Sequence, residues 1–108
     1  MSSEITVQQF LERRAQGIPM TLLDVREEWE IRLSPAPSAY LHIPMGQIPD
    51  RIQELDTGTQ IVVMCRAGGR SMEVARFLQQ RAGFTSVANL QGGILAWSRD
   101  IDPAIPAY

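Results

Sequence analysis

Residues 61–71 read Ile-Val-Val-Met-Cys-Arg-Ala-Gly-Gly-Arg-Ser, and this stretch decides the fold. Residues 61–64 are continuously apolar and mostly β-branched, which is typical of a strand covered on both faces. From Ser71 to Arg81, apolar side chains recur at the three- and four-residue spacing of an amphipathic helix. The segment therefore predicts a strand, a tight loop and a helix in succession.

Further short apolar strands alternate with helices on both sides of this unit. We expect helices at residues 6–17, 48–55 and after Gly92-Gly93, strands at 21–25, 40–43 and 85–88, a proline-rich loop at 34–38 and a surface tail at 98–108. Alternating strands and helices predict a three-layer, doubly wound α/β domain with a mainly parallel sheet of about five strands.

The composition fits one globular domain over residues 1–108, because domains cluster at roughly 100–150 residues and 44% of the chain is hydrophobic. The net charge of −2 gives no basic excess of the kind that nucleic-acid binding needs. No apolar run approaches the roughly 20 residues of a membrane helix, and Met1-Ser2-Ser3-Glu4 has no signal-peptide character. We therefore expect a cytoplasmic protein that binds neither nucleic acid nor membrane.

The chain has one cysteine, Cys65, and one histidine, His42. A single thiol cannot form an intrachain disulfide, and one residue of each type argues against a structural zinc site within the chain. The thiol is then either a reactive group or an inert core residue, since free cysteine is among the most buried residue types. The residues around it decide between these two interpretations.

The loop from Arg66 to Arg70 favours a reactive thiol. Cys65 follows a strand and Ser71 precedes a helix, and open α/β sheets bind ligands at the carboxyl ends of their strands. Two glycines let the short loop curl with its N–H groups inward as an anion nest. The helix N-terminus and both arginines add positive charge, which favours a thiolate. We expect the sulfur to be wrapped by the loop and open to solvent.

This loop resembles the active loop of the rhodanese family, which runs Cys-x-x-Gly-x-Arg-Ser/Thr, with Cys65, Gly68, Arg70 and Ser71 in those places. Three further segments are similar to that family and follow in its order: Leu22-Leu23-Asp24-Val25-Arg26-Glu27, His42-Ile43-Pro44-Met45 with Ile48-Pro49, and Asn89-Leu90-Gln91-Gly92-Gly93-Ile94-Leu95-Ala96-Trp97. Together they span most of residues 20–97.

The resemblance implies a rhodanese-like fold and a sulfurtransferase of the thiosulfate sulfurtransferase type. Sulfane sulfur would pass from thiosulfate or a protein persulfide to a thiophilic acceptor through a persulfide on the catalytic Cys65, without a cofactor. The implied substrate-binding residues are Arg66, Ala67, Gly68, Gly69, Arg70 and Ser71.

The end of the chain adds a candidate partner. Asp102-Pro103 and Pro106-Ala107-Tyr108 are similar to the end of rhodanese domains fused to ubiquitin-like-protein activating enzymes. Those domains pass sulfur to small carrier proteins. The resemblance therefore implies a sulfur carrier or a persulfide-donor protein as partner, beside a small anionic donor such as thiosulfate.

Two other functions stay open. One is a phosphatase- or arsenate-reductase-like enzyme on the same fold, and the other is a non-enzymatic regulatory module. The Cys-x4-Arg spacing from Cys65 to Arg70 is one residue shorter than the phosphatase loop, which suits a sulfur atom better than a phosphoryl group. Regulatory modules of this type often lack the cysteine, which is present here.

The sequence leaves two roles open for Asp24 and indicates structural roles for Arg26 and His42. Asp24 either orients an arginine near the loop or caps the turn after its strand, and Arg26 is expected in a structural ion pair. His42 is expected to be structural rather than a catalytic base. The family often has Gly-His-Ile where this chain has Pro35-Ala36-Pro37, and the effect on substrate choice stays open.

Overall fold

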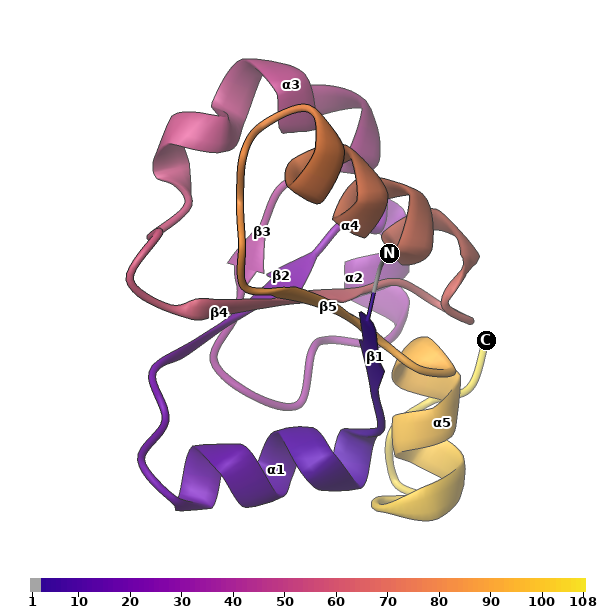
Figure 1. The fold of residues 1–108 in the computed structure, drawn as a ribbon. Coiled ribbons are helices and arrows are strands. Elements are labelled where there is room, and N and C mark those ends of the chain that lie inside the picture. Colours follow the sequence, from indigo (N-terminus) through magenta and orange to yellow (C-terminus); the bar gives the residue numbers. More distant parts are fainter. Residues whose placement is uncertain (1–2) are drawn as a thin grey trace.

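The computed structural model describes residues 3–108 and shows a parallel sheet with helices on both faces (Figure 1). Five strands form the sheet in the order β1-β5-β4-β2-β3, and every neighbouring pair is parallel. Their bounds are β1 (Ser3–Ile5), β2 (Met20–Asp24), β3 (Leu41–His42), β4 (Gln60–Met64) and β5 (Val87–Leu90). The predicted α/β fold with a mainly parallel sheet of about five strands is confirmed.

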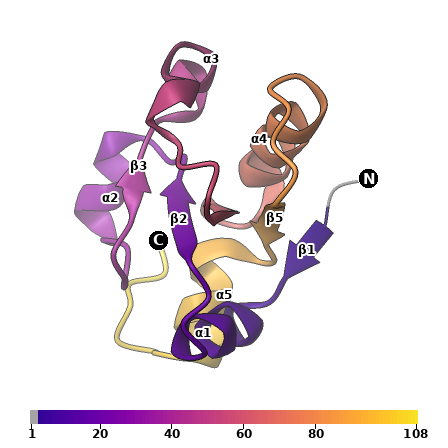
Figure 2. The same cartoon turned by 60° about the vertical axis from the view of Figure 1, so that its left-hand side comes forward.

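Helices α1 and α5 cover one face of the sheet, and α3 and α4 cover the other (Figure 1). Helix α2 lies beside the edge strand β3 (Figure 2). The helices are α1 (Val7–Ala15), α2 (Glu28–Leu33), α3 (Ile48–Arg51), α4 (Gly69–Gln80) and α5 (Gly93–Asp100), and 3₁₀ turns at Met45–Gln47 and Ile52–Glu54 flank α3. In residues 3–108, no helix has the length and apolar character required to cross a bilayer.

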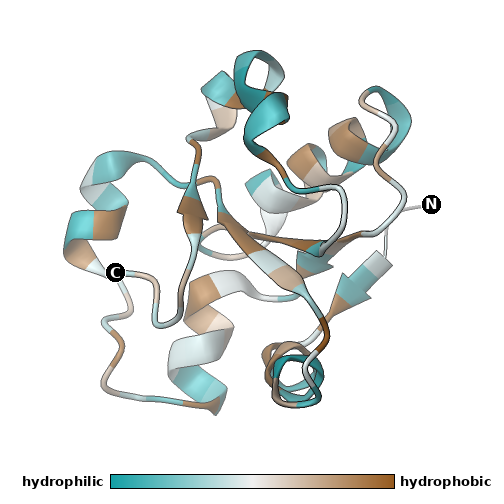
Figure 3. Cartoon of the chain, turned by 90° about the vertical axis from the view of Figure 1, so that its left-hand side faces the viewer, coloured by the Kyte–Doolittle hydropathy of each residue, from teal (hydrophilic) through white to brown (hydrophobic). Residues whose placement is uncertain are grey.

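The strands carry a separate apolar cluster on each face, because successive side chains of a strand point to opposite sides. In β4, Val62 and Met64 face the α1/α5 side, whereas Ile61, Val63 and the following Cys65 face the α3/α4 side. Hydrophobic colour accordingly concentrates in the central strands, whereas the helices alternate between hydrophobic and hydrophilic colours (Figure 3). The loop that begins at Cys65 thus leaves the buried central strand β4 on the α4 side of the sheet.

Several predicted elements shift by one or two residues, and two were not predicted. Helix α4 starts at Gly69 rather than at Ser71, and β5 spans 87–90 rather than 85–88. Strand β1 has only three residues, too few for an alternating pattern to be recognised. Helix α2 begins within the charged residues Arg26-Glu27-Glu28, where the sequence analysis assigned no helix or strand. It is stabilised by a capping box in which Glu27 is the N-cap and Glu30 the N3 residue.

The prediction of a surface tail over residues 98–108 is wrong in part. Residues 98–100 form the last turn of α5, and Ile105 is buried in the apolar cluster on the α1/α5 face. The hydroxyl of Ser98 donates to the carbonyl oxygen of Ile105 at 2.7 Å. This anchor returns the end of the chain toward α2 (Figure 2), and Tyr108 packs edge-to-face with Trp29 at 6.3 Å between ring centroids.

Candidate active site

Carbonyl oxygens of the loop between β4 and α4 accept hydrogen bonds from groups outside the loop. The N–H groups of Ile94 and Leu95, in the first turn of α5, donate to the carbonyl oxygens of Cys65 and Arg66 at 3.0 and 3.1 Å. The side-chain amide of Asn89 donates to the carbonyl oxygen of Gly68 at 3.2 Å. With these carbonyls fixed on the outside, loop N–H groups can point to the interior, as in an anion nest.

Two of those N–H groups and one hydroxyl surround the sulfur of Cys65. The N–H groups of Gly68 and Ser71 donate to Sγ at 3.1 and 3.4 Å, and the Ser71 hydroxyl lies 3.2 Å from it. Gly68 has φ of +108°, a backbone conformation that side-chain-bearing residues rarely adopt. The predicted wrapping of the sulfur by the loop is confirmed.

The expectation that the sulfur is open to solvent is wrong, because Cys65 retains only 1% of its accessible surface. The loop is compact, and Cys65 packs into the apolar cluster on the α4 side. The polar partners of the buried sulfur are the two main-chain N–H groups and the Ser71 hydroxyl. Electrostatic interactions are stronger in such a site than at the protein surface.

Behind the sulfur, Ser71 is held by a residue that the sequence interpretation did not single out. Its hydroxyl donates to Oδ1 of the buried Asn89 at 2.5 Å. The amide nitrogen of Asn89 donates to Gly68 O and, at 3.0 Å, to the carboxylate of Glu4 on β1. Because both of these partners only accept, the amide orientation is determined, and Asn89 joins β1, β5 and the loop.

Arg70 does not contact the sulfur but forms a two-pronged ion pair with Glu30 of α2. The two N–H···O distances are 2.7 and 2.8 Å, and the Glu30 side chain is buried. The carboxylate also accepts from the N–H group of Glu27 and the hydroxyl of Tyr108, both at 2.8 Å. The hydrogen bonds from Arg70 are the main reason that the pKa of Glu30 is lowered to about 2.

Arg66 turns toward the end of the chain. Its guanidinium donates to the main-chain carbonyl oxygen of Tyr108 and lies over the Tyr108 ring, 5.2 Å from the centroid. Ala67 and Gly69 complete the turn, and Gly69 opens α4. The structure therefore brings Cys65, Gly68 and Ser71 together as predicted. Both loop arginines engage partners from outside the loop that the sequence did not reveal.

Asp24 and Arg26 form a fully buried ion pair beside this network. One Asp24 oxygen caps the turn by accepting from the Arg26 N–H group at 3.0 Å, and the carboxylate binds the Arg26 guanidinium at 2.8 Å. Both roles expected for Asp24 are therefore present. His42 lies with Nε2 2.7 Å from the carbonyl oxygen of Arg26, which fits the structural role expected for it.

The Glu30 carboxylate makes acid stability a testable property. A depressed pKa stabilises the fold above the unfolded-state value of 4.5, and this contribution is lost as the pH falls from 4.5 toward 2. After a discount for the partly exposed Arg70, we expect about 2 kcal/mol. The urea unfolding free energies of the wild type and Glu30→Gln should differ by this amount at pH 7 and converge near pH 2. This account would be contradicted if the unfolding free energies of the wild type and Glu30→Gln ran parallel over pH 2–5. It would also be contradicted if the exposed Glu28→Gln lowered the unfolding free energy by the same amount.

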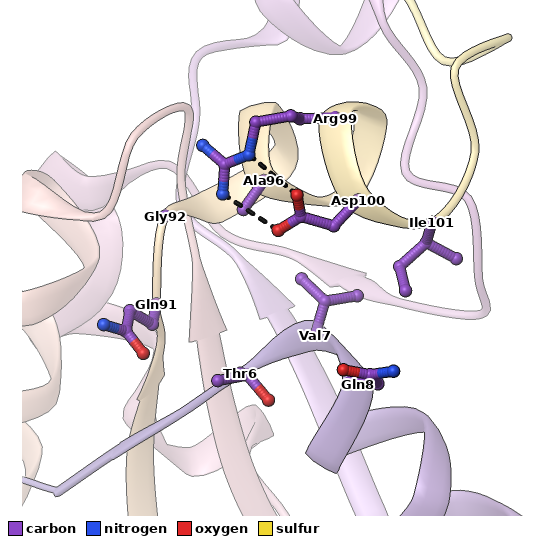
Figure 4. Close-up of a pocket in the computed structure, with 9 residues that line it drawn as sticks. All are labelled: Thr6, Val7, Gln8, Gln91, Gly92, Ala96, Arg99, Asp100 and Ile101. Atoms are coloured by element: carbon purple, nitrogen blue, oxygen red, sulfur yellow. Dashed lines mark hydrogen bonds and ion pairs between the residues drawn. The ribbon is translucent and has the colours of Figure 1, made fainter.

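A separate pocket of about 410 Å³ lies between the start of α1 and the end of α5 (Figure 4). Its only charged lining residues, Arg99 and Asp100, bond to each other at 2.8 and 2.9 Å. Within residues 3–108, no three histidine, cysteine, aspartate or glutamate side chains cluster to hold a metal ion. Cys65 lies on the opposite face of the sheet from this pocket.

The comparisons with known proteins agree on one family. A model of the rhodanese-like domain matches residues 6–100. The putative sulfurtransferase YtwF of Bacillus subtilis is 37% identical over 100 residues, which are 93% of this chain and 94% of that protein. A rhodanese-related protein from Thermoplasma volcanium has the same fold, with a TM-score of 0.81 at 24% identity over 98% of this chain and 99% of the other.

Two relatives are much longer than this chain. The rhodanese-like/PpiC domain-containing protein 12 of the Arabidopsis thaliana chloroplast is 43% identical over 81% of this chain, which spans 30% of that protein. The adenylyltransferase and sulfurtransferase MOCS3-1 of Zea mays is 31% identical over 99% of this chain, which spans 24% of it. The shared unit thus occurs both nearly alone and inside larger proteins.

Proposed function

The chain belongs to the rhodanese-like domain family, and from this premise we propose that it is a sulfurtransferase that carries sulfur as a persulfide on Cys65. The observation that supports the proposal most strongly is the pair of N–H groups, from Gly68 and Ser71, directed at Sγ at 3.1 and 3.4 Å. Relatives named as sulfurtransferases support the reaction class. The donor, the acceptor and the role of each loop residue are part of the proposal.

In the first half-reaction, the Cys65 thiolate attacks the sulfane sulfur of the donor. Its electron pair forms the new S–S bond, and the electron pair of the broken bond leaves with sulfite, if thiosulfate is the donor, or with a thiolate, if a persulfide is the donor. In the second half-reaction, a thiophilic acceptor takes the outer sulfur, and the Cys65 thiolate is regenerated. No redox or metal cofactor enters this balance, so we propose that none is needed.

The loop residues stabilise the anionic forms of this cycle. The N–H groups of Gly68 and Ser71 hold negative charge on the sulfur, as oxyanion-hole donors do for oxygen. Helix α4 adds the positive end of its dipole. Because protein atoms cover Sγ, loading requires side chains around the loop to move. Arg66, which is exposed and bound to the tail rather than to the loop, is the best placed to do so.

Thiosulfate and a protein persulfide are the donors that we propose to test, with a small sulfur carrier as the partner protein. The similarity to the maize adenylyltransferase and sulfurtransferase, which extends to 99% of this chain, supports a protein partner. The phosphatase-like alternative gains no support from the site. It needs the loop arginine to bind phosphoryl oxygens, whereas Arg70 has both terminal nitrogens on the Glu30 carboxylate.

Mass spectrometry of the intact protein tests the proposed function. Incubation with a thiol persulfide or with thiosulfate should add one sulfur, about 32 mass units, to Cys65. Subsequent cyanide should remove that mass and release an equal amount of thiocyanate. A wild-type protein that gains no sulfur from either donor would rule the proposal out.

Ser71→Ala tests the contribution of the hydroxyl beside the sulfur. We expect the single-turnover rate of sulfur loading to fall about tenfold, because the variant loses the hydroxyl that lies 3.2 Å from the sulfur and links it to Asn89, while both main-chain N–H groups remain. The control is Ser86→Ala, an exposed serine in the turn before β5. A Ser71 variant that loads as fast as the control would remove the hydroxyl from the mechanism.

A further inference from the structure

The charge around the reactive loop is largely cancelled by groups that come from elsewhere in the chain. Of the three arginines near the loop, Arg26 pairs with Asp24 and Arg70 pairs with Glu30. Arg66 donates to the main-chain oxygen of Tyr108. Among residues 3–108, no aspartate or glutamate side chain forms an ion pair with Arg66.

The surroundings of the Glu30 carboxylate favour its ionised form. Its two carboxylate oxygens accept four hydrogen bonds: two from Arg70, one from the N–H group of Glu27 and one from the Tyr108 hydroxyl. The side chain is 3% exposed, and the Arg70 hydrogen bonds keep its pKa far below neutrality. A buried, ionised carboxylate thus binds the guanidinium of the loop residue Arg70.

This carboxylate penalises donors of high negative charge. Attack by the Cys65 thiolate on thiosulfate brings three negative charges together, whereas attack on a neutral thiol persulfide involves one, and attack on its anion involves two. Like charges repel strongly where water is excluded. Because Glu30 cancels much of the charge of Arg70, the charge of the reacting groups is offset mainly by the Gly68 and Ser71 N–H groups, the α4 dipole and Arg66.

We propose that Glu30 is the specificity-determining residue of this site and selects thiol persulfides over thiosulfate as sulfur donors. The inference rests on the proposed function and specifies the chemical class of its sulfur donor. The persulfide reaction balances as a thiolate attacking R–S–SH: the outer sulfur and its proton stay on Cys65, and R–S⁻ leaves with the electron pair of the broken bond.

The test compares two donors, thiosulfate and cysteine persulfide, by the second-order rate constant of sulfur loading on Cys65. In the wild type, the constant for the persulfide should exceed that for thiosulfate by at least about 100-fold, equivalent to two tenfold electrostatic penalties. Glu30→Gln should raise the thiosulfate-to-persulfide ratio at least about tenfold, because one like charge is removed.

Two control variants distinguish the effect of the Glu30 charge on the donor ratio from the effects of side-chain length and of an exposed charge. Glu30→Asp keeps the carboxylate but shortens the side chain, so its donor ratio should stay near that of the wild type. Glu28→Gln removes an exposed carboxylate from the same helix and should also leave the ratio unchanged. A Glu30→Gln ratio equal to that of the wild type, or an equal shift in Glu30→Asp, would overturn the inference.

The outcomes also separate this inference from the proposed function. If neither donor loads Cys65, the proposed function itself fails. If both load the wild type at similar rates, the function stands and the role of Glu30 is overturned. That wild-type comparison needs no variant, so the inference stays testable even if Glu30→Gln does not fold.

Discussion

Replacement of Cys65 by serine should abolish sulfur loading and transfer. Oxygen in place of Sγ cannot form the persulfide, although the donors from Gly68 and Ser71 remain. We expect a loss of at least about 10³-fold in the rate of thiocyanate formation, which takes it to the detection limit of the cyanide assay. The mass increase of about 32 units should also be absent after incubation with either donor.

The interpretation of this loss depends on an intact fold. Serine is smaller than cysteine and can accept the same N–H groups, so the urea midpoint should shift little from that of the wild type. Ser71→Ala, with its partial loss of rate, provides an intermediate reference. Sulfur transfer by a folded Cys65→Ser protein would exclude the persulfide mechanism. An unaltered cellular phenotype with this variant would favour the regulatory-module alternative.

The strand, loop and helix around Cys65 could be predicted because their signals are local. A continuous apolar run specifies β4, helical spacing specifies α4, and the glycines allow the tight turn between them. The same local reasoning failed at β1, which has three residues and pairs with β5, 85 residues away in the sequence. It also failed at α2, whose six residues are stabilised by a capping box within a charged cluster.

The partners of the loop could not be predicted because they are tertiary. Glu30 lies 40 residues from Arg70 in the sequence, and Tyr108 lies 42 residues from Arg66. A charged loop with two arginines predicts an anion site, and nothing in the loop itself shows that a buried carboxylate already neutralises one of them. The capping box from Glu27 to Glu30 departs from the usual Ser/Thr-x-x-Glu pattern, and a capping box indicates a helix start rather than an ion pair.

Asn89 illustrates a different limit. It falls within the segment that resembles the family signature, but its side chain has no chemistry of its own that would single it out. Its importance comes from position, because it meets Ser71, Gly68 and Glu4 at once. Residues that orient a reactive group are found by geometry, whereas the reactive group itself was found by its type and its neighbours.

Substitution of Gly93 by alanine should destabilise the fold severely. A Cβ atom at this position would lie 2.5 Å from the carbonyl oxygen and 2.7 Å from the carbonyl carbon of Arg66, and closer still to the Cys65 carbonyl oxygen. Those atoms are backbone, and α5 binds the same carbonyls through Ile94 and Leu95. We expect a decrease of more than about 3 kcal/mol in the unfolding free energy, and a loss of sulfur loading in any folded fraction because the loop must move.

Gly17→Ala provides the matched control. Gly17 also has a positive φ, +82° against +60° at Gly93, but a Cβ there would meet no atom within 4 Å. Its substitution should cost only about 1 kcal/mol, the strain of a left-handed alanine, and should leave loading intact. The difference between the two variants in urea unfolding therefore measures the close approach of α5 to the loop. Equal losses would mean that backbone strain alone accounts for Gly93, and that α5 does not hold the carbonyls of the reactive loop in place.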